Sequence, residues 1–406
     1  MFKELFQKIF IGQSYWRMAP FAELAQVYVS RFLRVLSQSM VSVFVAVFLY
    51  QEGYSLSDIM LYVTGYYVLR ILASYLSAYY VGWVGPKRAT LASNILAVPS
   101  LVALAMLEQY VVFAAVGYFV FAALSLSLFT IASDTQFSSI KRNHIVGKEL
   151  SWLHIIERVG AGVSPLAGGL LATWFGPQSI MWIAAILMIC AALPLFITPE
   201  RTRRQRVIFH GLPWRKVWRQ MLSYGVSGAN QTTTETVWPL FVAVLVFGAT
   251  DNSVYAKLGA VLSLSLFAAI AVSHLYGALI DRRRGRELHK TGVALTVINH
   301  ALRTGATTPL SVVLINVGTE VGGSAYAMPY IRSLYDQADS LPGYRTTYIA
   351  AMMMGFCAGA ALLAFISALF LRYFEPPQGF MYSFIAISVI SLGMLAHGFP
   401  SLRKRS

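Results

Sequence analysis

Charged residues are scarce in this sequence. They make up 12% of its 406 residues, against 57% hydrophobic residues, and the mean hydropathy is +0.61. Soluble domains carry a charge on about a quarter of their residues. An ordinary soluble protein is therefore excluded, and the composition is that of a membrane protein. The apolar runs are long and continuous instead of alternating with period two, which argues against a β-barrel.

Cysteine is rarer still: only Cys190 and Cys357 are present, and both lie inside apolar runs. A thiol in such a run behaves as a small hydrophobic group, so neither a disulfide framework nor a metal site is expected. A glycine-rich phosphate loop followed by lysine is also missing, which excludes ATP hydrolysis as the energy source. His154 and Glu157 have the i, i+3 spacing of metal ligands on a helix, but no second such pair completes a site. We therefore expect no enzyme, no cofactor and no metal.

Long apolar runs are what the sequence does contain. Crossing about 30 Å of hydrocarbon takes roughly 20 residues of helix, because every backbone N–H and C=O must be satisfied within the segment. Six runs contain no Asp, Glu, Lys or Arg: 89–107, 111–133, 178–198, 258–280, 346–371 and 376–400. Six more appear when isolated ionisable residues are tolerated: 27–50, 57–82, 149–174, 221–247, 288–305 and 308–331. The predicted fold is an all-α integral membrane protein with twelve transmembrane helices.

The basic residues lie mainly on one side of these spans. Assigning the connections alternately to two sides places 25 of the 32 Lys and Arg in the N-terminal tail, the connections after even-numbered spans and the C-terminal LRKRS. Only Arg303 and Arg372 fall in the opposite connections. The positive-inside rule then predicts cytoplasmic termini and a multi-pass protein of the cell inner (plasma) membrane. The opening MFKELFQKIF has charges that interrupt any apolar core, so no cleaved signal peptide is expected.

The formal net charge of +15 does not indicate nucleic acid, because it is divided among short connections. The largest basic connection, 199–220, holds seven Arg or Lys interleaved with apolar residues. Such a segment suits a partly helical linker on the anionic lipid of the cytoplasmic leaflet.

This linker also divides the chain into similar halves. The sequence FVAV at 44–47 recurs at 241–244, and Gly85 aligns with Gly285 at an offset of 200. A repeat of half the chain length indicates duplication. The predicted organisation is an N-terminal tail (1–26), a six-helix bundle (27–198), the linker (199–220), a second six-helix bundle (221–399) and a basic tail (400–406).

Residues 277–286, GALIDRRRGR, resemble the loop motif of the major facilitator superfamily of secondary transporters. That motif is Gly, three residues, Asp, Arg, then Gly and basic residues; here one extra residue precedes Gly285. The resemblance covers essentially the whole chain through span count, central linker and repeat, and it implies two bundles that rock about a central site. The first half departs from the motif, because SAYYVGWVGPKR has Val81 or Gly82 where the acid would stand.

The resemblance also implies a partner for Asp281. At the C-terminus of its own helix a carboxylate meets the negative end of the helix dipole. In the family the acid faces the N-terminus of a helix in the opposite half, here the start of the fifth span near 147–150. The alternative is that Asp281 only pairs with Arg282 or Arg284 in solvent. The predicted cytoplasmic gate comprises Asp281, Arg282, Gly277, Gly285, Gly85 and Arg88.

The fifth span contains small residues at spacings that let helices approach closely, and a proline that bends it. These are Gly160, Ser164, Pro165, Gly168 and Gly169. In the family a similar run, with Gly where Ser164 stands, marks many proton-coupled exporters. The resemblance therefore favours export, whereas the alternative is helix packing with no directional meaning.

Ionisable residues at membrane depth are functional candidates, because a charge in hydrocarbon is costly. The family lines its cavity largely with spans one, four, seven and ten. The predicted cavity residues are Arg31, Arg34, Gln38, Arg70, Asp134, Asn230, Gln231 and Asn316. The predicted proton-coupling residues are Glu235, Glu320 and Glu157, because removal from water favours the neutral carboxyl. For Glu235 and Glu320 the alternative is structural ion pairing with Arg34 or Arg70.

Together these features predict a monomeric secondary transporter that exchanges a small organic solute for protons by alternating access, in the direction of export. The arginines of spans one and two suggest an anionic or amphiphilic substrate. Two alternatives remain: proton-coupled uptake on the same fold, and a protein of this fold that senses or binds a partner without transport.

Overall fold

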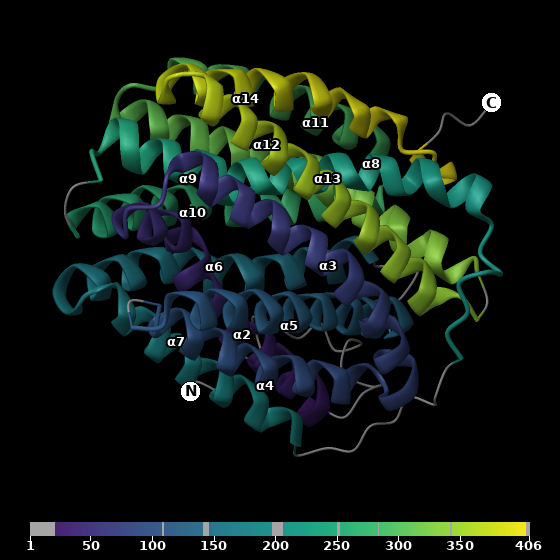
Figure 1. The fold of residues 1–406 in the computed structure, drawn as a ribbon. Helices are drawn as coiled ribbons and strands as arrows, with labels where there is room; N and C mark the ends of the chain where they lie inside the picture. The colour runs from purple at the N-terminus through teal and green to yellow at the C-terminus, as the bar shows by residue number, and fades with distance from the viewer. Residues whose placement is uncertain are drawn as a thin grey trace, which may run out of the picture.

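The computed structural model describes residues 21–107, 109–140, 146–196, 206–249, 252–282, 284–341 and 343–402, and all regular secondary structure in these ranges is helical (Figure 1). The first half contains α2 (Phe21–Gln51), α3 (Leu56–Val84), α4 (Pro86–Ala105), α5 (Val111–Ile140), α6 (Val146–Phe175), α7 (Pro177–Ala192) and the 3₁₀ turn η1 (Leu193–Phe196). The all-α class predicted from the sequence is confirmed within the described part of the chain.

The second half begins inside the predicted linker, at Trp214. Its first long segment is α8 (Trp214–Thr232), the π-helical turn η2 (Thr233–Val237), α9 (Trp238–Phe241) and a second π-helical turn, η3 (Val242–Val246). There follow α10 (Ser253–Asp281), α11 (Gly285–Leu302), η4 (Arg303–Gly305), α12 (Pro309–Asp339), α13 (Arg345–Tyr373), α14 (Pro376–Ser391), η5 (Leu392–Ala396) and η6 (Pro400–Leu402).

Eight helical segments in the described residues are long and apolar enough to cross a membrane, and each matches a predicted span. They are Tyr28–Gln51, Leu56–Val84, Pro86–Ala105, Ala114–Gln136, Ile155–Phe175, Pro177–Phe196, Arg345–Tyr373 and Pro376–Ala396. The chain is thus a multi-pass membrane protein. The other four predicted spans fall on α8 to η3, α10, α11 and α12, so the total of twelve spans stays a prediction.

Two Gly-Pro pairs make tight reversals of the chain. Gly85 (φ 93°) separates α3 from α4, and Gly176 (φ 83°) separates α6 from α7. A positive φ favours glycine, and a proline at the first helical position has the φ that a helix requires and no N–H to leave unpaired. The end of the bundle at which α3 meets α4 is called the Gly85 end below, and the opposite end, at which α2 meets α3, is called the Gln51 end.

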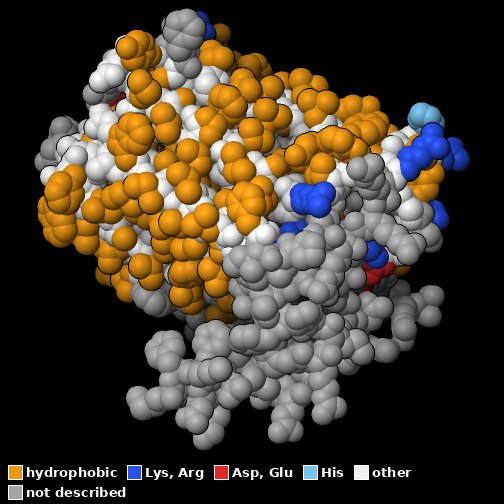
Figure 2. All heavy atoms as spheres, turned by 90° about the horizontal axis from the view of Figure 1, so that it is seen from below, with side chains coloured by type: hydrophobic (Ala, Val, Ile, Leu, Met, Phe, Trp, Pro, Cys, Tyr) orange, Lys and Arg blue, Asp and Glu red, His pale blue; other side chains and the backbone are white. Residues whose placement is uncertain are grey.

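The two halves contact each other along two helix pairs, α3 with α13 and α6 with α10. In Figure 1 these four helices lie in the middle, with α4, α5 and α7 on one side and α11, α12 and α14 on the other. Figure 2 shows hydrophobic side chains over much of one face of the molecule, as expected of a surface in lipid.

At the Gln51 end a hydrophobic core contains residues of both halves. The ring of Phe44 on α2 meets that of Tyr255 on α10 edge-on, with centroids 5.4 Å apart. The Tyr255 hydroxyl donates a hydrogen bond of 2.6 Å to Gln51 Oε1, and the Ser57 hydroxyl donates one of 3.0 Å to the Ala368 carbonyl. The halves are therefore packed together at this end.

Candidate functional site

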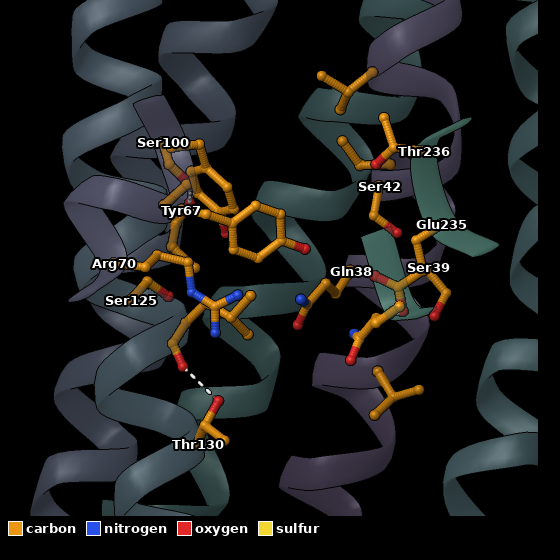
Figure 3. A pocket seen from close by; sticks show the side chains of 18 of the residues that line it. Gln38, Ser39, Ser42, Tyr67, Arg70, Ser100, Ser125, Thr130, Glu235 and Thr236 are labelled. Carbon is orange, nitrogen blue, oxygen red and sulfur yellow. Dashed lines mark hydrogen bonds between the residues drawn. The ribbon is translucent and has the colours of Figure 1, made fainter. Parts of the chain in front are cut away.

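A cavity of about 510 Å³ lies between the two halves (Figure 3). Its lining comes from both halves, mainly from α2, α3 and α5 of the first and from α8, η2, α12 and α13 of the second. Eight of the residues predicted from the sequence line it: Arg31, Arg34, Gln38, Arg70, Asp134, Glu157, Gln231 and Glu235.

Arg31 and Glu157 form an ion pair across the cavity wall, from α2 to α6. The Arg31 Nε atom lies 2.6 Å from Glu157 Oε1, and their side chains are 14% and 28% exposed. Nearby, the hydroxyl of Tyr335 on α12 donates a hydrogen bond of 3.0 Å to Asp134 Oδ1 on α5. This bond connects the halves on the Gly85 side of the cavity.

Arg34 is held by neutral groups and is 2% exposed. Its Nη1 donates to Asn94 Oδ1 at 2.7 Å and its Nη2 to Ser125 Oγ at 3.0 Å, while its guanidinium carbon lies 4.1 Å from the centroid of the Phe129 ring. A buried charge is tolerated when dipoles and a ring face replace its lost hydration. The sequence interpretation did not include Asn94, although an amide inside the charge-free run 89–107 is a signal that could have found it.

Arg70 on α3 has a different environment. It is 3% exposed, and its guanidinium carbon lies 5.7 Å and 5.5 Å from the ring centroids of Tyr66 and Tyr67. Its Nε atom is buried without a hydrogen-bond partner among the described residues. Figure 3 shows its guanidinium group directed into the pocket, toward Gln38 of α2.

Glu235 lies on the π-helical turn η2, on the side of the pocket opposite Arg70 (Figure 3). Its Oε1 accepts a hydrogen bond of 2.8 Å from Gln231 Nε2. The hydroxyl groups of Thr232 and Thr233 donate hydrogen bonds to the backbone carbonyls of Gly228 and Ala229, one helical turn earlier. Such bonds compete with the regular helix ladder, which is consistent with the irregular turn that carries Glu235.

Three other predicted site residues do not line this cavity. Asn230, one position before Gln231, faces into the second half, where its Oδ1 accepts a hydrogen bond of 3.1 Å from the Ser391 hydroxyl. Asn316 Oδ1 accepts one of 2.6 Å from Trp238 Nε1. Glu320 forms an ion pair with Arg158, whose Nη1 lies 2.6 Å from Glu320 Oε2.

The side chain of Arg303, which the sequence placed in an outer connection, is 0% exposed. Its guanidinium carbon lies 5.0 Å from the Trp238 ring centroid, and its Nη2 donates to Thr319 Oγ1 at 3.0 Å. Arg303 lies in the connection between α11 and α12, as predicted, and the turn η4 directs its side chain into the second half. Arg372 is exposed, as a connection residue should be.

Tyrosines form much of the cavity wall, and the sequence interpretation missed them. Tyr62 and Tyr118 stack at 6.5 Å with their rings 9° from parallel, and Tyr66 meets Tyr67 at 5.3 Å. All four line the cavity. The sequence did contain an indication of this wall, because Tyr62 and Tyr66 are four residues apart and so share one face of a helix.

The small residues of α6 contact both neighbouring helices through backbone atoms. A Cβ added at Gly168 would lie 3.0 Å from the Met40 carbonyl oxygen on α2, and one added at Gly169 would overlap the Tyr255 carbonyl on α10. The Pro165 carbonyl lies against Gly259 of α10 in the same way. Ser164 donates to the Gly160 carbonyl within its own helix, so its hydroxyl is satisfied without a partner on another helix.

The predicted gate residues are described only in part. Asp281 is the last residue of α10, but its side chain, like those at the start of α6, lies outside the described residues. Of the predicted glycines, Gly277 is buried and Gly85 forms the α3–α4 turn. A Cβ added at Gly285 would contact Pro329. The side chains of Arg282 and Arg88 are exposed. One contact here was not predicted: Arg332 Nη1 donates to the Ile280 carbonyl at 2.9 Å, where a cation suits the negative end of α10.

Comparison with known proteins places this geometry in context. A sequence profile described as Major Facilitator Superfamily matches residues 27–298. The curated proteins contain no match. Among solved structures, the nucleoside transporter NupG is 14% identical with a TM-score of 0.64, covering 95% of this chain and 100% of its own. The human organic anion transporter MFSD10 (TETRAN) is 13% identical with a TM-score of 0.65, covering 93% of this chain and 100% of its own.

Proposed function

Because the chain belongs to the major facilitator superfamily, whose members are transporters and not enzymes, we propose that it moves a small organic solute across the membrane by alternating access. The observation that carries this is the cavity between the halves, lined by polar side chains from both. We further propose twelve spans, cytoplasmic termini and a monomer in the cell inner (plasma) membrane, so that the Gly85 end faces the cytoplasm. The basic linker then lies on anionic lipid.

Protons are the proposed coupling ion, and Glu235 is the proposed carrier. A carrier must gain and lose a proton during the cycle, and an adjacent cation opposes protonation. Glu157 and Glu320 are each ion-paired with an arginine at 2.6 Å, whereas the hydrogen-bond partner of Glu235 is the neutral amide of Gln231. Among the three glutamates, Glu235 is therefore best suited to change its protonation state.

Export by antiport is the first candidate for direction. It is supported by the close approach of α6 and α10, in which Gly169 and Pro165 contact the backbone of the opposite half. The two solved structures named above are a nucleoside transporter and an organic anion transporter, so the fold alone does not select a substrate.

Uptake by symport is the second candidate, and the opposed placement of Arg70 and Glu235 supports it (Figure 3). An anionic solute beside Arg70 would disfavour the ionised form of Glu235. Solute and proton would then bind together and cross in the same direction.

Proton movement in proteoliposomes tests these candidates. A solute gradient imposed on vesicles containing a trapped pH-sensitive dye should move protons against the solute in antiport and with it in symport. Glu235→Gln vesicles are the matched control and should show no solute-driven proton movement. A solute that binds but moves no proton and does not itself cross would contradict transport and favour a sensor.

A further inference from the structure

Three arginines and three acidic residues line the cavity, and five of these six have polar partners. Arg31 is paired with Glu157, and Arg34 is bonded to Asn94 and Ser125. Asp134 accepts from Tyr335 and Glu235 from Gln231. Arg70 is the exception: the contacts of its guanidinium group with described residues are the rings of Tyr66 and Tyr67.

A guanidinium group that is 3% exposed, and whose Nε atom is buried without a hydrogen-bond partner among the described residues, is costly to bury. Aromatic faces offset part of the lost hydration, but they supply no acceptor for the N–H groups. The group is directed into a cavity large enough for an organic solute (Figure 3). An anion in that cavity would supply both the countercharge and the acceptors.

The wall around Arg70 is aromatic. Tyr62 and Tyr118 present nearly parallel rings, and Tyr66 and Tyr67 flank the guanidinium group. Flat apolar faces stack favourably on a planar ring, in offset or edge-on geometry. The same side of the cavity thus offers an anion-binding group and a surface for a ring.

We propose that the transported solute is a planar organic anion, with its acidic group bound by Arg70 and its ring packed on Tyr62, Tyr66, Tyr67 and Tyr118. Arginine suits this role because its N–H groups match the two oxygens of a carboxylate. The inference rests on the proposed transport function and names its substrate class. It also favours the symport candidate, since an anion and a proton on Glu235 would stabilise each other.

Binding of a matched pair of probes tests the proposal. Full-length purified protein is titrated with 1-naphthoate and with its neutral analogue 1-naphthamide, in equilibrium dialysis. We expect naphthoate to bind about tenfold or more tighter than naphthamide, because the charge-assisted hydrogen bonds are available only to the anion. In Arg70→Gln this preference should disappear while naphthamide binding persists, which shows that the cavity is still folded.

Two further variants keep the test decisive if Arg70→Gln does not fold. Arg70→Lys retains the charge but loses the paired donors, so it should keep only part of the preference for naphthoate. Tyr66→Leu removes a ring and should weaken both probes without changing their ratio. Equal binding of the two probes by the native protein, or naphthoate binding unaffected in Arg70→Gln and Arg70→Lys, would overturn the proposal.

The experiments distinguish failure of the planar-anion inference from failure of the proposed transport function. If neither probe binds but another solute drives proton movement in vesicles, the planar-anion inference is wrong and transport stands. If naphthoate binds through Arg70 but neither it nor any proton crosses the membrane, the substrate site is a ligand site of a non-transporting protein.

Discussion

Arg158 on α6 donates a hydrogen bond from Nη1 to Oε2 of Glu320 on α12, 2.6 Å away and 162 residues further along the chain. The pair joins the two halves, and its side chains are 29% and 15% exposed. Glu320 and Glu235 are both single acids in polar spans, but their partners differ. Glu320 is ion-paired with an arginine, whereas Glu235 accepts a hydrogen bond from the neutral amide of Gln231. An ion pair between halves that must separate is a contact of one conformational state.

Glu320→Gln should therefore shift the population toward a state in which the two halves separate at this pair. The pair is partly exposed, so we expect a change on the order of 1 kcal/mol, which alters a two-state ratio several-fold. Labelling of a cysteine introduced at Leu334, in a background without Cys190 and Cys357, measures the opening. The double variant Arg158→Glu, Glu320→Arg is the control and should restore the native labelling rate. Unchanged labelling in Glu320→Gln would show that the pair persists in both states or contributes nothing.

Glu235→Gln should abolish proton coupling while leaving solute binding measurable. Glutamine keeps the shape of the side chain and its contact with Gln231 but cannot gain or lose a proton. Solute-driven proton movement in vesicles measures coupling, and equilibrium dialysis measures binding. Glu157→Gln is the comparison. Loss of its ion pair with Arg31 should change the conformational equilibrium more than the number of protons moved per solute. Full proton-driven flux in Glu235→Gln would remove this residue from the coupling mechanism.

Asp281→Asn should shift the population toward the inward-open state, because it removes a charge that we propose meets the positive N-terminal end of α6 only when the cytoplasmic side is closed. A carboxylate at a partly buried helix terminus contributes on the order of 0.5 to 2 kcal/mol. Neither Val81 nor Gly82 can replace it in the first half. Cytoplasmic labelling of a cysteine introduced near Glu157 measures the shift. Native labelling in a folded, inserted variant would mean that Asp281 only pairs with Arg282 or Arg284.

Gly169→Ala should disfavour closure at the Gln51 end, because the new methyl group would overlap the Tyr255 carbonyl of the opposite half. Overpacking of this kind costs about 1 to 3 kcal/mol. Gly160→Ala on the same helix is the matched control, since its Cβ would lie 3.4 Å from the Phe32 ring, an ordinary contact. Both substitutions replace glycine with alanine inside α6, so both raise its helix propensity by a similar amount and differ only in the contact they create. Thermal unfolding and labelling from the outer side should separate the two variants; identical behaviour would show that α6 and α10 can part slightly without loss.

Helical periodicity identified which residues share a face but not which helix covers that face. Arg31, Arg34 and Gln38 were assigned to one face by their spacing, and all three line the cavity. The partners of these residues could not be inferred, because Asn94 and Glu157 come from other helices whose order in space the sequence does not state. The burial of Arg303 could not be inferred for the same reason, because it depends on Trp238, which lies 65 residues earlier. The extent of the apolar runs placed breaks close to Gly85 and Gly176, and the Gly-Pro pair at each of these points reverses the chain through its own backbone.

The π-helical turns around Glu235 give this segment an axial freedom that an ordinary helix lacks. A π turn holds one more residue than an α turn, and its conversion to α geometry rotates the residues beyond it by about 100° around the helix axis. Glu235 lies within such a turn, between α8 and α9, which have regular geometry. Conversion to α geometry would keep Glu235 beside Gln231, because residues at i and i+4 are neighbours on an α-helix, and it would rotate Trp238 and the residues beyond it about the helix axis without a break in the helix.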